Sequence, residues 1–182
     1  MAWQLDPAHT QVEFSAKHMM ITTVRGRFGE FSAVAELDES DLTKSTVEFT
    51  IQTASLDTRQ EQRDAHLRSA EFFDVEKYPT ITFKSTSVKS LGRDRYEVTG
   101  DLTVKGVTKP ETFEVTSEGH AKDPWGKEHH GFTVTGKIDR KDFGLNWNVA
   151  LETGGWLVGD DIKIAMDVEL IKVDAPVAAA TA

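Results

Sequence analysis

Residues 162–170 read Ile-Lys-Ile-Ala-Met-Asp-Val-Glu-Leu and form the longest alternating run in the chain. Apolar side chains stand at every second position from Ile162 to Leu170. In an extended strand these side chains all project to one face, and the residues between them project to the other. One buried face and one solvent-exposed face are typical of an antiparallel sheet. The run therefore predicts antiparallel β-structure.

The same period of two recurs along most of the chain before this run. Shorter examples are Val12–Phe14–Ala16, Phe31–Ala33–Ala35–Leu37, Val47–Phe49–Ile51, Ile81–Phe83, Tyr96–Val98, Leu102–Val104, Phe113–Val115 and Phe132–Val134. Turn-forming residues separate these runs. They give about eight strands, the number at which a closed barrel can hold its own side chains or one small ligand. We predict one all-β domain over residues 1–173, an antiparallel sandwich or barrel of about eight strands, and a disordered C-terminal tail at residues 174–182.

One segment interrupts the alternation. Residues 58–73, TRQEQRDAHLRSAEFF, are rich in Arg, Gln and Glu, which favour helices. Thr58 and Glu61 have the spacing of a capping box. Leu67 and Phe72 give only an irregular apolar face, so such a helix has to lean on the β-structure. We predict one short helix packed against the β-structure.

Composition excludes several classes of function. The net charge of −9 argues against nucleic-acid binding, because affinity for phosphates comes from clustered Lys and Arg. There is no cysteine for disulfide or thiolate chemistry. No apolar run approaches the ~20 residues of a membrane span. The N-terminus has neither the basic nor the apolar region of a secretory signal, so we predict a cytoplasmic protein that does not span a membrane.

The common catalytic and cofactor motifs are absent from the sequence. His129 and His130 could join His120 in a metal site, but adjacent residues of a strand point to opposite faces, and a solvated loop pair is the favoured interpretation. His66 with Asp64 could serve as an acid–base pair, although a surface hydrogen bond is favoured. We therefore predict no enzyme activity, no catalytic residue, no metal and no cofactor.

Several motifs, taken in order, resemble the YceI-like family, the bacterial polyisoprenoid-binding proteins. They are Asp6-Pro-Ala-His9, Gly26-Arg-Phe28, Arg63-Asp-Ala-His-Leu67, Glu71-Phe-Phe-Asp74, Tyr78-Pro-Thr-Ile-Thr-Phe83, Gly100-Asp-Leu-Thr-Val-Lys-Gly106-Val-Thr-Lys-Pro110 and Arg140-Lys-Asp-Phe-Gly144. The resemblance implies a lipocalin-like barrel of eight strands with a helix near it. Its interior would be a long apolar pocket for a polyisoprenoid, an isoprenoid quinone or a related lipid, which the protein would carry or store.

Periodicity alone cannot distinguish a filled barrel from a hollow one, because both need apolar residues on the inward face. For a hollow barrel we expect the pocket wall to include Phe14, Phe28, Phe31, Phe49, Leu67, Phe72, Phe73, Phe83, Phe132, Phe143 and Trp147. Candidates for contact with a ligand head group are Arg25, Arg63 and Arg140, each of which could instead form a surface salt bridge. Two alternatives stay open, an enzyme acting on an isoprenoid substrate and a ligand-free structural or stress-response barrel. A homodimer is only the commonest default.

Overall fold

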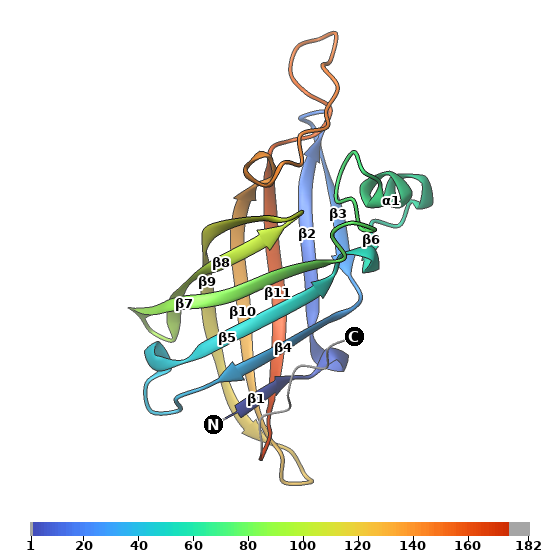
Figure 1. Cartoon of the computed structure of the whole chain (residues 1–182). Helices are drawn as coiled ribbons and strands as arrows, with labels where there is room; N and C mark the ends of the chain where they lie inside the picture. The colour runs from blue at the N-terminus through green and yellow to red at the C-terminus, as the bar shows by residue number, and fades with distance from the viewer. Residues whose placement is uncertain (1, 175–182) are drawn as a thin grey trace.

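The computed structural model describes residues 2–174, which form one closed antiparallel β-barrel and one α-helix (Figure 1). The strands are β1 Ala2–Leu5, β2 Gln11–His18, β3 Thr22–Phe28, β4 Phe31–Glu36, β5 Thr46–Gln52, β6 Leu56–Asp57, β7 Thr80–Gly92, β8 Arg95–Val104, β9 Val107–Lys122, β10 Glu128–Asp139 and β11 Asp161–Lys172. The helix is α1, Glu61–Arg68, and the 3-10 helices are η1 Pro7–His9, η2 Leu42–Lys44, η3 Thr53–Ser55 and η4 Arg140–Phe143. Of the predicted tail, residues 175–182 lie outside the described residues.

The eleven strand segments within residues 2–174 occupy eight positions around the barrel. β11 pairs with β2 through Lys163–Asp167 and with β1 through residues 170–172, so β1 and β2 share one position. β3 and β4 share the next position, because β2 pairs with β3 and β1 pairs with β4. β5 and β6 share the third position, because β4 pairs with β5 and β3 pairs with β6. β7 to β11 occupy the other five positions in sequence order. The predicted eight-stranded antiparallel barrel is confirmed.

Breaks in the first three strand positions change their direction. Between β1 and β2, Pro7 has no N–H for a ladder, and the Asp6 carboxylate accepts the Ala8 N–H at 2.9 Å to begin η1. β2 and β3 therefore run steeply in Figure 1, while β1, β4 and β5 cross the molecule obliquely. The chain between β6 and β7 forms α1.

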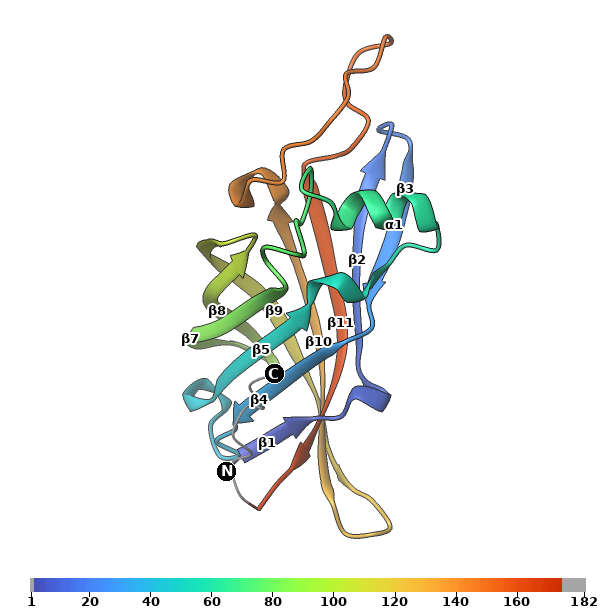
Figure 2. The same cartoon turned by 45° about the vertical axis from the view of Figure 1, so that its right-hand side comes forward.

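The helix is shorter than the predicted 58–73, and its cap is a different residue. Gln60, not Thr58, caps α1, and its side chain accepts the Arg63 N–H. Thr58 is buried and donates its N–H to the Asp64 carboxylate at 2.9 Å, so a residue inside the helix holds the chain before it. Arg68 ties the other end to the Leu56 carbonyl at 2.7 Å. The helix thus lies beside the upper end of β3 (Figure 2).

Two groups of buried side chains hold the barrel wall together. One lies low, where Trp3, Leu37 and Leu170 gather. The other lies higher and includes Leu56 and Phe143, which are almost fully buried. Within residues 2–174 no helix has the length and apolar character needed to cross a bilayer.

Candidate functional site

A cavity of about 690 Å³ lies inside the barrel, within the ~300–1,000 Å³ typical of ligand pockets. Its wall is made of the inward-facing apolar side chains of the strands. On β11 the lining extends from Ile162 to Leu170, eight residues apart, which at ~3.4 Å per residue is roughly 27 Å. The run that predicts the fold therefore also forms the long wall of the cavity.

Cross-strand pairs of glycine and phenylalanine keep this interior hollow. Gly26 lies opposite Phe14, and a Cβ on Gly26 would come within 2.9 Å of the ring atom Cε1. A Cβ on Gly100 would meet Phe83 Cε2 at 2.8 Å, and a Cβ on Gly136 would likewise meet the ring of Phe113. Each ring lies against the sheet in space that a side chain would otherwise fill.

The ring beside Gly136 belongs to Phe113, and its Cε1 would lie 2.9 Å from a Cβ on Gly136. Small residues add to the effect, because Ala16, Ala33 and Ala35 also line the cavity. The barrel interior is therefore a cavity and not a filled core, which the sequence pattern left open.

Ten of the eleven residues predicted for the pocket wall line the cavity. They are Phe14, Phe28, Phe49, Leu67, Phe72, Phe73, Phe83, Phe132, Phe143 and Trp147. Phe31 does not line it. Its ring stacks on that of Phe49, with the centroids 6.1 Å apart, and packs against both buried groups. Phe113 and Met166 line the cavity but were not predicted; their inward phase in the alternation could have identified them.

Two of the three predicted head-group arginines are wrongly placed for that role. Arg25 is exposed on β3 and does not line the cavity. Arg140 lines the cavity but is 2% exposed, and its guanidinium donates to backbone carbonyls. The acceptors are Leu145, Trp147, Val158 and Gly159. Arg140 therefore shapes the loop between β10 and β11 and has its donors committed.

Arg63 is the predicted arginine that fits the cavity. Its Nε donates to Thr58 Oγ1 at 2.8 Å and its Nη2 to the Thr58 carbonyl at 2.7 Å. Among residues 2–174, its Nη1 makes no hydrogen bond. The guanidinium is thus fixed in place at the cavity with one nitrogen still able to donate.

Polar side chains gather at the upper end of the cavity, which we call the mouth. They are His18, Gln60, Gln62, Arg63 and His66. The loop after η4 reaches α1 there, because the Trp147 ring contacts His66 with centroids 4.6 Å apart and Phe72 at 5.4 Å. The cavity therefore combines an apolar interior with one polar end.

The acid–base pair considered for His66 is not formed. Asp64 is buried and bonded to Thr58, while His66 bonds to Glu71 on the other side. No direct hydrogen bond or ion pair joins Asp64 and His66 within the described residues. His66 and Phe72 pack edge to face, with centroids 5.1 Å apart, which gives this histidine a packing role beside its surface hydrogen bond.

The adjacent histidines of β10 do point to opposite faces, but they lie in a strand and not in a solvated loop. His130 is buried, and its ring stacks on that of Phe132 with the centroids 4.3 Å apart. A hydrogen bond of 2.8 Å joins its Nε2 to Ser117 Oγ. Burial lowers the pKa of His130. His129 faces outward between two carboxylates, Asp123 at 3.1 Å and Glu169 at 2.7 Å.

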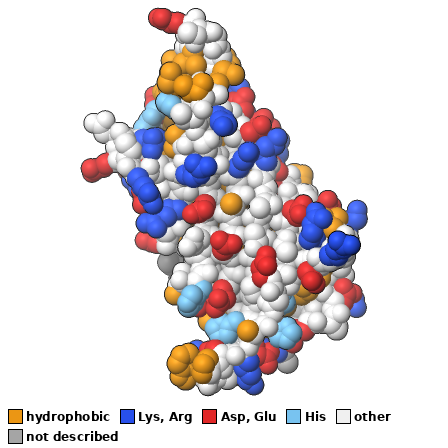
Figure 3. Space-filling view, turned by 180° about the vertical axis from the view of Figure 1, so that it is seen from behind, with side chains coloured by type: hydrophobic (Ala, Val, Ile, Leu, Met, Phe, Trp, Pro, Cys, Tyr) orange, Lys and Arg blue, Asp and Glu red, His pale blue; other side chains and the backbone are white. Residues whose placement is uncertain are grey.

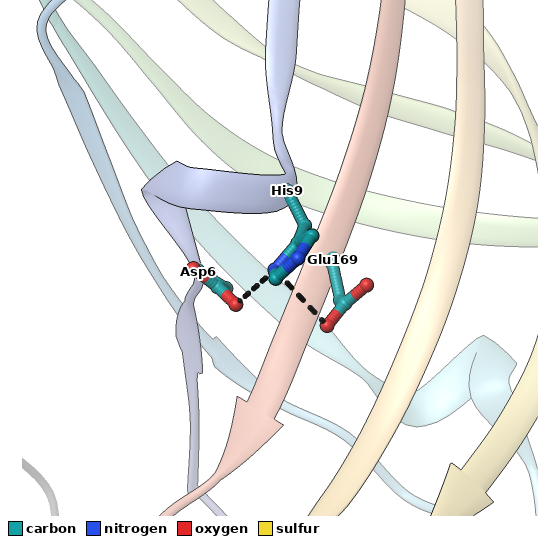
Figure 4. Close-up of side chains that lie close together, drawn as sticks. All are labelled: Asp6, His9 and Glu169. Atoms are coloured by element: carbon teal, nitrogen blue, oxygen red, sulfur yellow. Dashed lines mark hydrogen bonds and ion pairs between the residues drawn. The ribbon is translucent and has the colours of Figure 1, made fainter. Parts of the chain in front are cut away.

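Glu169 also belongs to a second pairing on the outside of the barrel (Figure 4). His9 Nδ1 lies 2.7 Å from Asp6 and 3.9 Å from Glu169. Hydrogen bonding to Asp6 raises the pKa of His9, and hydrogen bonding to Asp123 and Glu169 raises the pKa of His129. These pairs connect η1, β10 and β11 and lie outside the cavity.

Comparison with known proteins agrees with this geometry. The sequence matches the model of the YceI-like domain over residues 3–170. A UPF0312 protein of Staphylococcus aureus is 41% identical over 165 residues, which is 90% of this chain and 94% of that protein.

Solved structures share the barrel. The Campylobacter jejuni YCEI protein is 33% identical with a TM-score of 0.75, covering 87% of this chain and 90% of that one. Burkholderia cenocepacia BcnA is 26% identical with a TM-score of 0.80, covering 91% and 98%. A polyisoprenoid binding domain from Saccharophagus degradans has the same fold at 14% identity, with a TM-score of 0.63 and coverage of 92% and 97%. The chain belongs to the YceI-like family.

Proposed function

We propose that this protein binds one long-chain apolar amphiphile inside the barrel and serves as its carrier or storage protein. The observation that carries the proposal is the apolar cavity of about 690 Å³ with polar side chains at one end. An amphiphile matches this arrangement, with its tail in the interior and its head group near Arg63 at the mouth.

The length of the cavity favours a polyisoprenoid or the tail of an isoprenoid quinone. The hydrocarbon core of a bilayer is ~30 Å thick, so a lipid chain of one leaflet spans about half of that. The cavity lining along β11 extends roughly 27 Å, so it accommodates a longer chain. Each buried methylene contributes ~0.8 kcal/mol, so a five-carbon unit contributes up to about 4 kcal/mol before the cost of ordering.

The comparisons support the same class of ligand. A domain of the same fold from Saccharophagus degradans is described as polyisoprenoid binding. Binding also fits the site better than catalysis does, because Asp64 and His66 are each bonded to other residues and do not converge. The cytoplasmic location, the homodimer and the absence of a cofactor stay predictions.

The test is a titration of lipid-free protein with prenyl alcohols of increasing length. The dissociation constant should fall with each added isoprene unit and level off when the chain fills the cavity. Ala16→Phe adds a ring to the cavity wall and should move the plateau to a shorter chain, whereas Ala121→Phe on the exposed face of β9 should not. Absence of binding for every chain length would refute the proposal.

A further inference from the structure

A group of exposed apolar side chains covers the upper end of the molecule. This group, the apolar tip, consists of Met19, Met20, Ile21, Val149 and Trp156. Met20 is 65% exposed, Ile21 76% and Trp156 52%, although large apolar side chains are usually covered. Figure 3 shows hydrophobic side chains at this end of the molecule, with one acidic side chain beyond them at its extremity.

Two hairpins build the apolar tip together. One is the turn between β2 and β3, and the other lies before β11, where Ala150 and Trp156 form a bridge. The Met19 N–H donates to the Leu157 carbonyl at 2.8 Å and joins the hairpins. The tip is therefore one surface made of two connected segments.

The turn between β2 and β3 adopts a conformation that does not suit its residues. Met19 has φ 51° and Met20 has φ 64°, the left-handed region in which tight hairpins normally place Asn and Gly. A methionine pair gives up free energy there and leaves two flexible apolar side chains in water. Such local disagreement between sequence and conformation marks functional positions.

The apolar tip borders the mouth of the cavity. His18 lines the mouth and directly precedes Met19, while Leu157 and Val158 line it and directly follow Trp156. If the proposed function holds, a lipid that enters or leaves at the mouth passes this surface. The biological role of the surface therefore rests on the proposed function, whereas its composition and position do not.

A row of four cross-strand neighbours on the outer face below the apolar tip holds three basic residues, with Ser15 at the position on β2. Lys137 pairs with Lys163, Lys163 lies opposite Ser15, and Ser15 lies opposite Arg25, so the row spans β10, β11, β2 and β3. Lys137 is paired with Asp161 at 3.4 Å, but Lys163 and Arg25 form no ion pair within residues 2–174. Figure 3 shows Lys and Arg side chains gathered below the hydrophobic end.

Relative to the turn between β2 and β3, the position of this row matches the depth of a bilayer interface; the hairpin before β11 extends beyond that turn (Figure 1). Arg25 and Ser15 are each three residues from the ends of their strands, which places them about 10 Å below the turn at ~3.4 Å per residue. Interfacial segments bury their apolar side chains ~5–10 Å deep, with basic side chains at the level of the head groups. The chain as a whole carries −9, so the two cations of this row without an ion pair, Lys163 and Arg25, stand out against the overall negative charge.

We propose that the apolar tip docks on an anionic phospholipid bilayer, with Met19, Met20, Ile21 and Trp156 in the interface. Lys163 and Arg25 then contact the phosphate groups, and the mouth of the cavity faces the membrane surface. A second copy of the chain fits this end less well, because it would bring two basic rows toward each other.

The test is cosedimentation with vesicles of phosphatidylcholine containing phosphatidylglycerol, compared with vesicles of phosphatidylcholine alone. Wild-type protein should bind the anionic vesicles at low salt and lose binding at high salt. Met19→Asn with Met20→Gly installs residues that suit the turn, so the variant folds, and it should weaken binding by roughly tenfold or more. Trp125→Ala, at an 85% exposed tryptophan in the turn between β9 and β10, should leave binding unchanged.

The charged row has its own matched pair of variants. Lys163→Glu should weaken binding to anionic vesicles, whereas Lys89→Glu on the exposed face of β7 should not. Lack of wild-type binding, or full binding by the Met19→Asn, Met20→Gly variant, overturns the docking proposal. A wild-type dimer that this variant converts to a monomer assigns the tip to self-association and also overturns it. Prenyl alcohol binding is measured separately on the same variants, so failure of docking and failure of the proposed function are distinguished.

Discussion

Gly136→Ala tests whether the barrel is hollow because its rings lie over glycines. A Cβ at this position would come within 2.9 Å of Phe113 Cε1, and an ordinary contact begins at 3.4 Å, so this ring atom has to withdraw by at least 0.5 Å (3.4 − 2.9). The sheet blocks one direction, so the ring moves into the cavity. There it takes the place of one or two methylenes of a ligand.

The expected result is a larger effect on binding than on folding. Losing one or two buried methylenes costs ~0.8–1.6 kcal/mol, which weakens ligand affinity about four- to fifteenfold. Overpacking typically costs ~1–3 kcal/mol, and we expect the lower limit because the ring has free space to enter. Prenyl alcohol titration gives the first number and urea unfolding the second.

Gly131→Ala is the control on the same strand, because its Cβ would meet only the Glu118 Cβ at 3.5 Å, an ordinary contact. It should change neither quantity. If Gly136→Ala instead lowered stability by several kcal/mol and left affinity unchanged, the ring would be packed in a filled core, and the reasoning would be refuted.

Three further predictions concern charged residues. Arg140→Met should lower the free energy of unfolding by about 2–4 kcal/mol in urea, since buried carbonyls lose their donor, while Lys141→Met at the surface should not. Arg63→Met should weaken binding of a prenyl phosphate but not of the alcohol of equal length; equal losses for both would contradict the head-group role. Because folding raises the pKa of His129, its protonated imidazole stabilises the fold. This stabilisation is complete below the pKa of the unfolded state, near 6.5, and is lost as the pH rises through the pKa of the folded state. His129→Gln should therefore lose less stability than wild type between about pH 6 and pH 9. That difference isolates His129 from His130, whose lowered pKa acts in the opposite sense.

The strands were predictable because alternation reports one buried face directly. Ile162–Leu170 and the shorter runs therefore locate the barrel wall without any knowledge of pairing. The cavity was not predictable in the same way. It depends on which residue lies opposite which, such as Phe14 opposite Gly26, and that register is set by the whole closed sheet.

The errors at single residues have related causes. Thr58 resembled a helix cap, but it pairs with Asp64 within the segment that follows, a contact between side chains that spacing rules for caps do not describe. Arg140 was predicted to contact a head group, but its guanidinium donates to four backbone carbonyls of the loop between β10 and β11, a fold of the chain that the sequence pattern does not show. Arg25 has the outward phase of its strand, which the alternation around Phe28 already indicated.

The mass of the purified protein under non-denaturing conditions tests most directly whether the barrel holds a long-chain lipid. We predict a mass equal to the chain plus one long-chain prenyl lipid, which extraction into organic solvent removes. The bare mass of the chain, unchanged after incubation with prenyl alcohols, prenyl phosphates and isoprenoid quinones, would contradict the claim.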